Sequence, residues 1–132
     1  MRACLIVLTL CFSAALVAAD ASAAQSLATQ SAGGSGVTIK ATPRALPGGF
    51  WEFDIVFDTH SQELKDDLMK TATLVADGRA HLPVGWKGDP PGGHHRKGVL
   101  RFNAINPAPK AIELRIARPG EPKPRSFRWP LK

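Results

Sequence analysis

The segment from residue 50 to 59, FWEFDIVFDT, constrains the fold more than any other part of the chain. Its large apolar side chains recur at every second position, with charged residues and one valine between them. Because successive side chains of a β-strand point to opposite faces, this pattern predicts a strand with one face in a hydrophobic core. The residues predicted to face that core are Trp51, Phe53, Ile55 and Phe57.

Shorter segments of strand character lie on both sides of this strand. They cover residues 37–42, 71–76, 79–84, 99–103, 111–117 and 126–131, and turns rich in glycine or proline separate several of them. Asp77-Gly78, between two of these segments, is a residue pair that favours a type I′ hairpin. About seven short strands with regularly spaced turns predict an all-β fold, an antiparallel two-sheet sandwich of immunoglobulin-like type. A small barrel is the alternative.

The segment from Ser61 to Lys70 is compatible with more than one local structure. Ser61 is a suitable N-cap for a short helix with its acidic residues placed early, as the helix dipole prefers. Leu64 and Leu68 would then share one face of that helix. A crossover loop or an irregular edge strand fits the same residues equally well.

Residues 1–24 have the features of a cleavable signal peptide. Arg2 precedes an apolar run of about fifteen residues, shorter than the ~20 that span a bilayer. Ala21-Ser22-Ala23 then matches the A-x-A cleavage pattern. We therefore expect a periplasmic or secreted protein with no transmembrane segment after processing. Residues 25–36, QSLATQSAGGSG, are small and polar and predict a flexible leader, which leaves a single domain over residues 37–132.

Both cysteines, Cys4 and Cys11, lie in the predicted signal peptide. The processed chain would therefore have no disulfide and no thiolate metal site, and its stability would depend on its packed core. The chain has 17 basic and 11 acidic residues and a formal net charge of +6, without a long basic run. In an exported protein this charge favours an anionic envelope component or a protein as partner, and not nucleic acid. A charge that only keeps the protein soluble is the alternative.

Polar residues concentrate at His60 and in the loop from Trp86 to Gly98. If the strand 50–59 extends to His60, that residue and Asp58 project from the same face. The carboxylate could then accept the imidazole N–H and fix its tautomer. The loop has many glycines and prolines and contains the block GGHHR at residues 92–96. Long loops inside compact domains are often functional.

One hypothesis for this region is a metal site. His60, His94 and His95 would bind one ion, with Asp58 or Asp89 as a further ligand or as a partner of a ligand. Imidazole and carboxylate ligands suit copper(II) or zinc, whereas the lack of thiolate disfavours copper(I). The spacing matches no zinc motif, and adjacent histidines in a strand point to opposite faces, so the loop would have to bend.

Two other interpretations explain the same residues without a metal ion. In the first, the loop is a bracing network in which a histidine bonds Asp58, Arg96 pairs with a carboxylate and Trp86 covers the end of the sandwich. In the second, Trp86 and Arg96 bind a small molecule, a glycan or a partner protein.

The sequence contains no nucleophile elbow, no paired-carboxylate cleft and no phosphate loop, so we expect no enzyme. The function predicted is a non-enzymatic exported binding module with a His-rich polar loop, with copper(II) or zinc as the leading ligand. The alternative is a structural or protein-interaction domain of the cell envelope in which that loop is only a bracing network.

Several motifs resemble those of a group of small exported bacterial proteins. They are Asp58-Thr59-His60-Ser61, Trp86, the segment 92–98 (GGHHRKG), Leu100-Arg101-Phe102 and a closing Phe127-Arg128-Trp129. The group carries a THS…W…GGHHR-x-G-x-L-x-F signature, and the resemblance covers residues 37–131. It implies one β-rich domain, a location in the bacterial envelope and joint action of His60 with the loop 94–96. It implies no particular activity.

Overall fold

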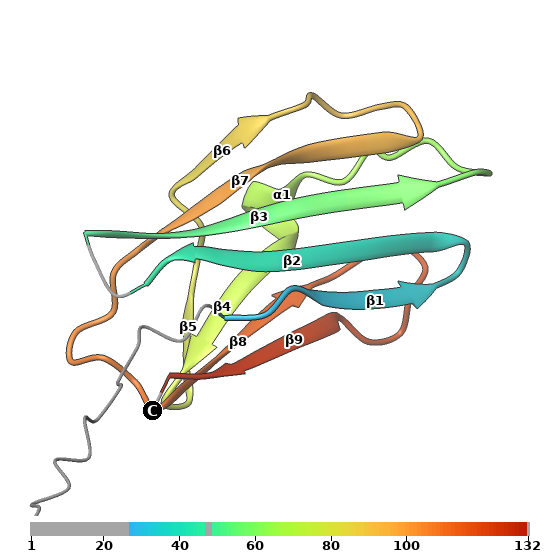
Figure 1. Ribbon diagram of the computed structural model, residues 1–132. Helices are drawn as coiled ribbons and strands as arrows, with labels where there is room; N and C mark the ends of the chain where they lie inside the picture. Colours follow the sequence, from blue (N-terminus) through green and yellow to red (C-terminus); the bar gives the residue numbers. More distant parts are fainter. Residues whose placement is uncertain (1–26, 47–48, 132) are drawn as a thin grey trace, which may run out of the picture.

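The structure of the protein, a computed structural model, describes residues 27–46 and 49–131. The predicted signal peptide and the first residues of the predicted leader lie outside these ranges. The described residues form nine strands and one short helix, α1 (Leu68–Thr71) (Figure 1). The strands are β1 (Gln30–Gly34), β2 (Val37–Ala45), β3 (Phe50–Thr59), β4 (Ala72–Ala76), β5 (Arg79–His81), β6 (Gly85–Gly88), β7 (His95–Asn103), β8 (Ala111–Ile116) and β9 (Arg125–Pro130).

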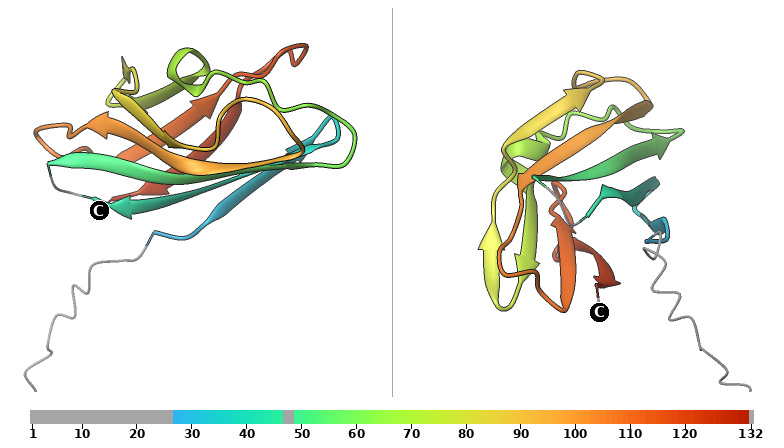
Figure 2. Two further views of the ribbon diagram at one scale, coloured as in Figure 1. Left: turned by 90° about the horizontal axis from the view of Figure 1, so that it is seen from above. Right: turned by 60° about the vertical axis from the view of Figure 1, so that its left-hand side comes forward.

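The strands form two antiparallel sheets that face each other as the layers of a sandwich (Figure 2). One sheet has five strands in the order β1-β2-β3-β7-β6, and the other has four in the order β5-β4-β8-β9. The predicted antiparallel two-sheet sandwich is therefore confirmed. The consecutive strands β1, β2 and β3 are neighbours in one sheet, whereas immunoglobulin-like sandwiches place the second and third strands in opposite sheets. The immunoglobulin-like arrangement is thus not confirmed.

The predicted strand 50–59 is β3, and its buried residues alternate with outward-facing ones as the sequence pattern predicts. Trp51, Phe53, Ile55 and Phe57 are fully buried, and the residues between them lie on the outer face. Phe53 packs edge-on against Phe102 at 5.8 Å between ring centroids and against Trp129 of the opposite sheet at 5.6 Å. Burial of a side chain of this size stabilises the fold by about 1.5–3 kcal/mol. This pattern of large side chains therefore positions β3 at the centre of the core.

Two hairpin turns have the positive backbone angles of type I′ turns. Asp77 and Gly78, with φ of 50° and 74°, join β4 to β5 as predicted. Ser35 and Gly36, with φ of 49° and 76°, join β1 to β2 in the same way. Residues 30–34, which lie in the predicted flexible leader, therefore form an edge strand paired with β2. Small side chains suit this edge, and the Ser-Gly pair provides the turn that a hairpin needs.

The long loop predicted over residues 86–98 is shorter in the structure. Residues 85–88 form β6, β7 already begins at His95, and residues 89–94 connect the two strands. Residues 61–67 form an irregular crossover that leads into α1. Asp67, not Ser61, caps this helix, because its carboxylate accepts a hydrogen bond from the Met69 N–H at 3.1 Å. No helix in the described part of the chain is long and apolar enough to cross a membrane.

Candidate functional site

Asp58 and His95 form a polar pair on the outer face of the five-stranded sheet. They are opposite each other on β3 and β7, and His95 Nδ1 is in hydrogen-bonding contact with Asp58 Oδ1. Both side chains are about half exposed, His95 at 58% and Asp58 at 46%. A histidine does pair with Asp58, but it is His95 and not His60. The strand register explains the difference, because β3 ends at Thr59 and the chain bends away at His60.

The other two predicted metal ligands, His60 and His94, belong to backbone segments that lie side by side. Both side chains are exposed. The N–H of Thr59 donates to the carbonyl of His94 at 2.9 Å, which holds the two segments side by side. Across residues 27–46 and 49–131, no three His, Cys, Asp or Glu side chains form a group that could hold a metal ion. The structure therefore brings together Asp58 and His95, and not the full set of predicted ligands.

Arg96, predicted to bind a ligand or to pair with a carboxylate, is instead a core residue with 2% exposure. It follows His95 on β7 and points to the opposite, inner face of the sheet. Its Nη1 donates to the carbonyls of Asp66 at 2.7 Å and Leu64 at 3.4 Å, and its Nη2 donates to the carbonyl of Asp89 at 3.4 Å. The guanidinium is thus held by backbone oxygens, and its Nε has no hydrogen-bond partner within the described structure.

The carbonyls that Arg96 contacts belong to two different segments. Leu64 and Asp66 lie in the crossover 61–67, and Asp89 lies in the connection between β6 and β7. The backbone joins the same two segments directly, because the N–H of Leu64 donates to Gly93 O at 2.9 Å and the N–H of Gly92 donates to Leu64 O at 2.7 Å. Arg96 therefore lies on the core side of these two hydrogen-bonded segments and holds them together.

Trp86 on β6 completes this brace. Its Nε1 donates to the carbonyl of Asp89 at 3.1 Å, and the guanidinium carbon of Arg96 lies 5.6 Å from its ring centroid, within cation–π range. The ring also covers Gly98 so closely that a Cβ there would lie 2.6 Å from the indole Cζ2. Gly98 is required at this position because any larger residue would displace the tryptophan.

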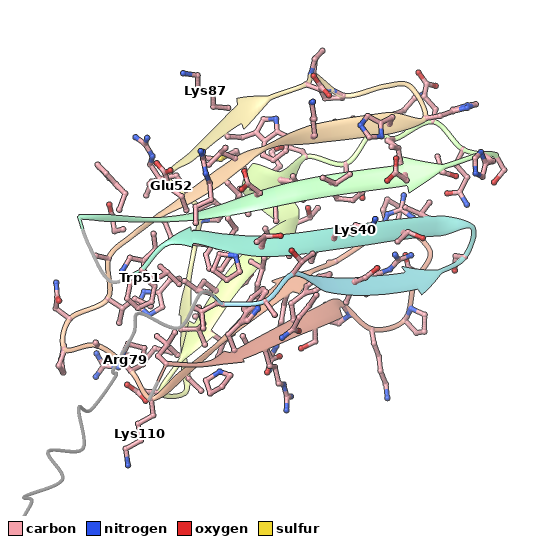
Figure 3. The ribbon with its side chains drawn as sticks, viewed as in Figure 1. Lys40, Trp51, Glu52, Arg79, Lys87 and Lys110 are labelled. Atoms are coloured by element: carbon pink, nitrogen blue, oxygen red, sulfur yellow. The ribbon has the colours of Figure 1, made fainter. Side chains whose placement is uncertain are left out.

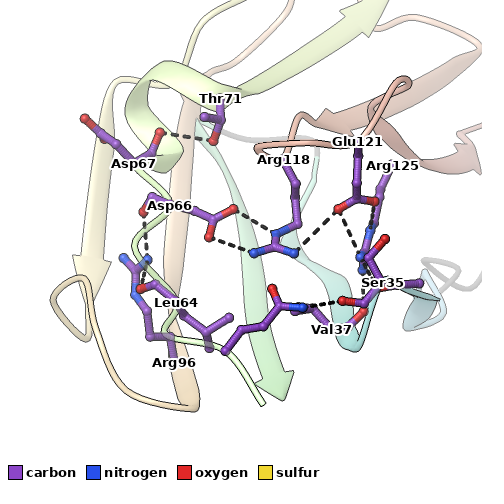
Figure 4. Close-up of polar contacts among 12 residues, drawn as sticks. Ser35, Val37, Leu64, Asp66, Asp67, Thr71, Arg96, Arg118, Glu121 and Arg125 are labelled. Atoms are coloured by element: carbon purple, nitrogen blue, oxygen red, sulfur yellow. Dashed lines mark hydrogen bonds and ion pairs between the residues drawn. The ribbon is translucent and has the colours of Figure 1, made fainter. Parts of the chain in front are cut away.

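A second set of buried charges, which the sequence did not reveal, continues from Asp66 (Figure 4). Asp66 accepts two hydrogen bonds from Arg118, at 3.0 and 3.3 Å. Glu121 lies 3.5 Å from Arg118 and accepts from Arg125 at 3.0 and 3.2 Å. All four side chains are at most 14% exposed. Buried charges are tolerated only when they are paired in this way.

Arg125 ends this chain of charges at the β1–β2 hairpin. Its guanidinium donates to the carbonyls of Ala32 at 2.9 Å, Gly34 at 2.6 Å and Val37 at 2.6 Å. One signal could have indicated its burial. Arg125 shares the strand parity of Phe127 and Trp129, which are large apolar residues and are both buried. Asp66, Arg118 and Glu121 lie outside the strands, where no periodic pattern exists to indicate burial.

Comparison with known proteins gives no match to a family model, to a curated protein or to a solved structure.

Proposed function

We propose that this chain is a non-enzymatic structural or protein-interaction domain of the bacterial cell envelope, in which the loop 89–96 is a bracing network. The observation that carries the proposal is the buried Arg96 guanidinium, which donates only to backbone carbonyls. Because this guanidinium is buried and already donates to the backbone, it is not accessible to a ligand. The envelope location rests on the predicted signal peptide and on the resemblance of the GGHHR motif to exported proteins.

A copper(II) or zinc site is the competing proposal. The contact between Asp58 and His95 favours it, because an imidazole held by a carboxylate is a good ligand. The exposed side chains of His60 and His94 would have to move to reach that pair. Bracing requires no such movement, and we therefore prefer it.

Unfolding experiments on the purified protein separate the two proposals. Arg96→Ala should lower the free energy of unfolding by about 2–3 kcal/mol, since it removes charged hydrogen bonds and leaves the carbonyl of Asp66 unpaired. Arg79→Ala, at an exposed position on β5, is the matched control and should change it by less than about 0.5 kcal/mol. His60→Ala should resemble this control.

Metal titration of the same proteins completes the test. Under bracing, copper(II) or zinc leaves the midpoint of thermal unfolding unchanged. A metal that binds only the native state at a hundredfold excess over its Kd would add ~2.7 kcal/mol. Stoichiometric binding that disappears in both His60→Ala and His94→Ala would replace bracing with the metal site. An Arg96→Ala protein of unchanged stability would contradict bracing.

A further inference from the structure

A shallow depression lies on the five-stranded sheet, and Trp86, whose ring packs near Arg96, is one of the residues that line it. It has a volume of about 300 Å³ and lies where β2 ends and β6 begins. Its other lining residues include Arg44, Glu52, Gly85, Lys87, Val99 and Arg101. Figure 3 shows Glu52 and Lys87 on this part of the molecule.

Two of the residues that line the depression, Gly85 and Val99, contribute little bulk. Gly85 has no side chain, and Val99 is opposite Lys87 on the neighbouring strand. A Cβ at Gly85 would lie 3.9 Å from the Cβ of Arg101, an ordinary van der Waals contact. The space above Gly85 can therefore accept a larger side chain without strain, so the backbone itself does not demand glycine there.

The charge of the depression is positive. Three cations, Arg44, Lys87 and Arg101, surround one carboxylate, Glu52, which leaves a net charge of 3 − 1 = +2. Glu52 lies 2.8 Å from Arg101 and 3.9 Å from Arg44, and Arg44 also lies 3.5 Å from Asp54. Among the described residues, no carboxylate pairs with Lys87. Lys87 is thus the cation of the depression that is available to an anionic group.

Apolar side chains border the depression. Val84 lines it and is 46% exposed, and Leu82, two positions earlier, is 69% exposed. Phe50 is 48% exposed, with the guanidinium carbon of Arg101 at 4.7 Å from its ring centroid. Large exposed apolar side chains next to charged ones are typical of protein-interaction sites.

The strand beside the depression can take an extended partner. β6 is the last strand of its sheet and forms the upper rim of the molecule in Figure 1. An edge strand offers unpaired backbone N–H and C=O groups, and a peptide can pair with them as a further strand. A glycan has no peptide backbone and cannot bind in this way. We propose that this depression, with the β6 edge, binds an extended acidic segment of a partner protein, with a carboxylate at Lys87 and an apolar side chain at Val84. This inference rests on the proposed function as an interaction domain and specifies its partner.

The test is an amide chemical-shift titration of the ¹⁵N-labelled protein with the capped hexapeptide Glu-Val-Asp-Leu-Glu-Thr. Shifts should cluster on β6 and on the adjoining ends of β3 and β7. The uncharged peptide Gln-Val-Asn-Leu-Gln-Thr should bind at least about fivefold more weakly, the scale of one or two exposed charge contacts. Lys87→Glu should weaken the acidic peptide by a similar factor, and Lys110→Glu, at the far end of the molecule in Figure 3, should not.

Gly85→Val provides a test that does not depend on charge. Its side chain takes up part of the depression beside Arg101, and because strands favour valine over glycine the protein should remain at least as stable while binding the peptide more weakly. The proposal is overturned if Gly85→Val and Lys87→Glu bind the peptide as well as the wild type, if the uncharged peptide binds equally, or if an oligogalacturonate binds there and the peptide does not. The stability of Arg96→Ala, which tests bracing, does not depend on whether the peptide binds. Bracing and partner binding are therefore tested separately.

Discussion

Glu113 on β8 shows how a surface carboxylate is held by its neighbours. It is in hydrogen-bonding contact with Arg115 Nε on its own strand and lies 2.8 Å from Arg128 Nε on β9. The hydrogen bond from Arg115 is the largest of several effects that lower the pKa of Glu113, partial burial opposes it, and Ser126 and Arg128 add to the lowering. The charged form of Glu113 therefore stabilises the folded protein.

The pH dependence of stability follows from this lowered pKa. Glu113 contributes stability above the unfolded-state pKa, about 4.3 for a glutamate, and this contribution is lost as the pH falls through the lower folded-state pKa. Glu113→Gln should therefore lower the midpoint of thermal unfolding at pH 7, and its difference from the wild type should shrink below about pH 4.3. Melting curves between pH 2 and 7 measure this. Glu63→Gln, at a 58% exposed position, is the control, and a constant Glu113→Gln deficit at every pH would contradict the assignment.

Arg96 shows what the sequence could and could not indicate about the site. Positions 96, 98, 100 and 102 share one face of β7, and Leu100 and Phe102 face the core, so strand parity alone places Arg96 inward. Arginine is rarely buried, however, and the sequence does not show which carbonyls would receive it. Its acceptors at Leu64, Asp66 and Asp89 come from irregular segments, whose paths depend on the finished fold.

At the scale of elements, β1 is held on its two sides by different interactions. On one side it pairs with β2 as a regular antiparallel strand. On the other side it faces β9 of the opposite sheet, and side chains make the connection. The side-chain amide of Gln30 bonds both the N–H and the carbonyl of Arg128, and Trp129 Nε1 donates to Ala28 O at 2.7 Å. This row of contacts, together with Arg125, closes one side of the sandwich.

Replacement of Arg125 should open that side first. Arg125→Ala removes one of the two arginine partners of Glu121 and three hydrogen bonds to the β1–β2 hairpin, and we expect a loss of about 3 kcal/mol in the free energy of unfolding. Hydrogen exchange should show the largest increase at the amides of β1, with β3 and β7 less affected. Arg79→Ala, at an exposed position on β5, is the control. Unchanged protection of β1 in Arg125→Ala would contradict this role of Arg125.

The elements that could be predicted from the sequence are those with strong local signals. The alternation of β3 and the Asp77-Gly78 turn each define a structure through a few adjacent residues. β1 and β6 have no such signal, because β1 consists of small and polar residues, β6 has two glycines among its four residues, and the pairing of both depends on neighbouring strands. The same Ser-Gly pair that suggested a flexible leader forms a tight hairpin turn once β2 is present.

At the scale of the whole molecule, export can be tested directly. We expect the chain, expressed in a bacterial host, to be recovered from the envelope or the medium with a new N-terminus at residue 24 or 25, because Ala21-Ser22-Ala23 matches the cleavage pattern. N-terminal sequencing of the fractionated protein measures this. Replacement of Ala21 and Ala23 by leucine should block processing. An intact N-terminus in the cytoplasmic fraction of the wild type would contradict export.

The row of contacts between β1 and β9 also affects how synthesis and folding are ordered in time. The hydrogen bonds from Arg125 to Gly34 and from Trp129 to Ala28 join residues 91 and 101 positions apart. A nascent chain can form its first hairpin early, but it cannot close the sandwich until the last strand has emerged from the ribosome or the translocation channel. Contacts of such high sequence separation slow folding. An incomplete chain would therefore keep one side of its core open to solvent, and a quality-control protease could use that difference to distinguish unfinished molecules from finished ones.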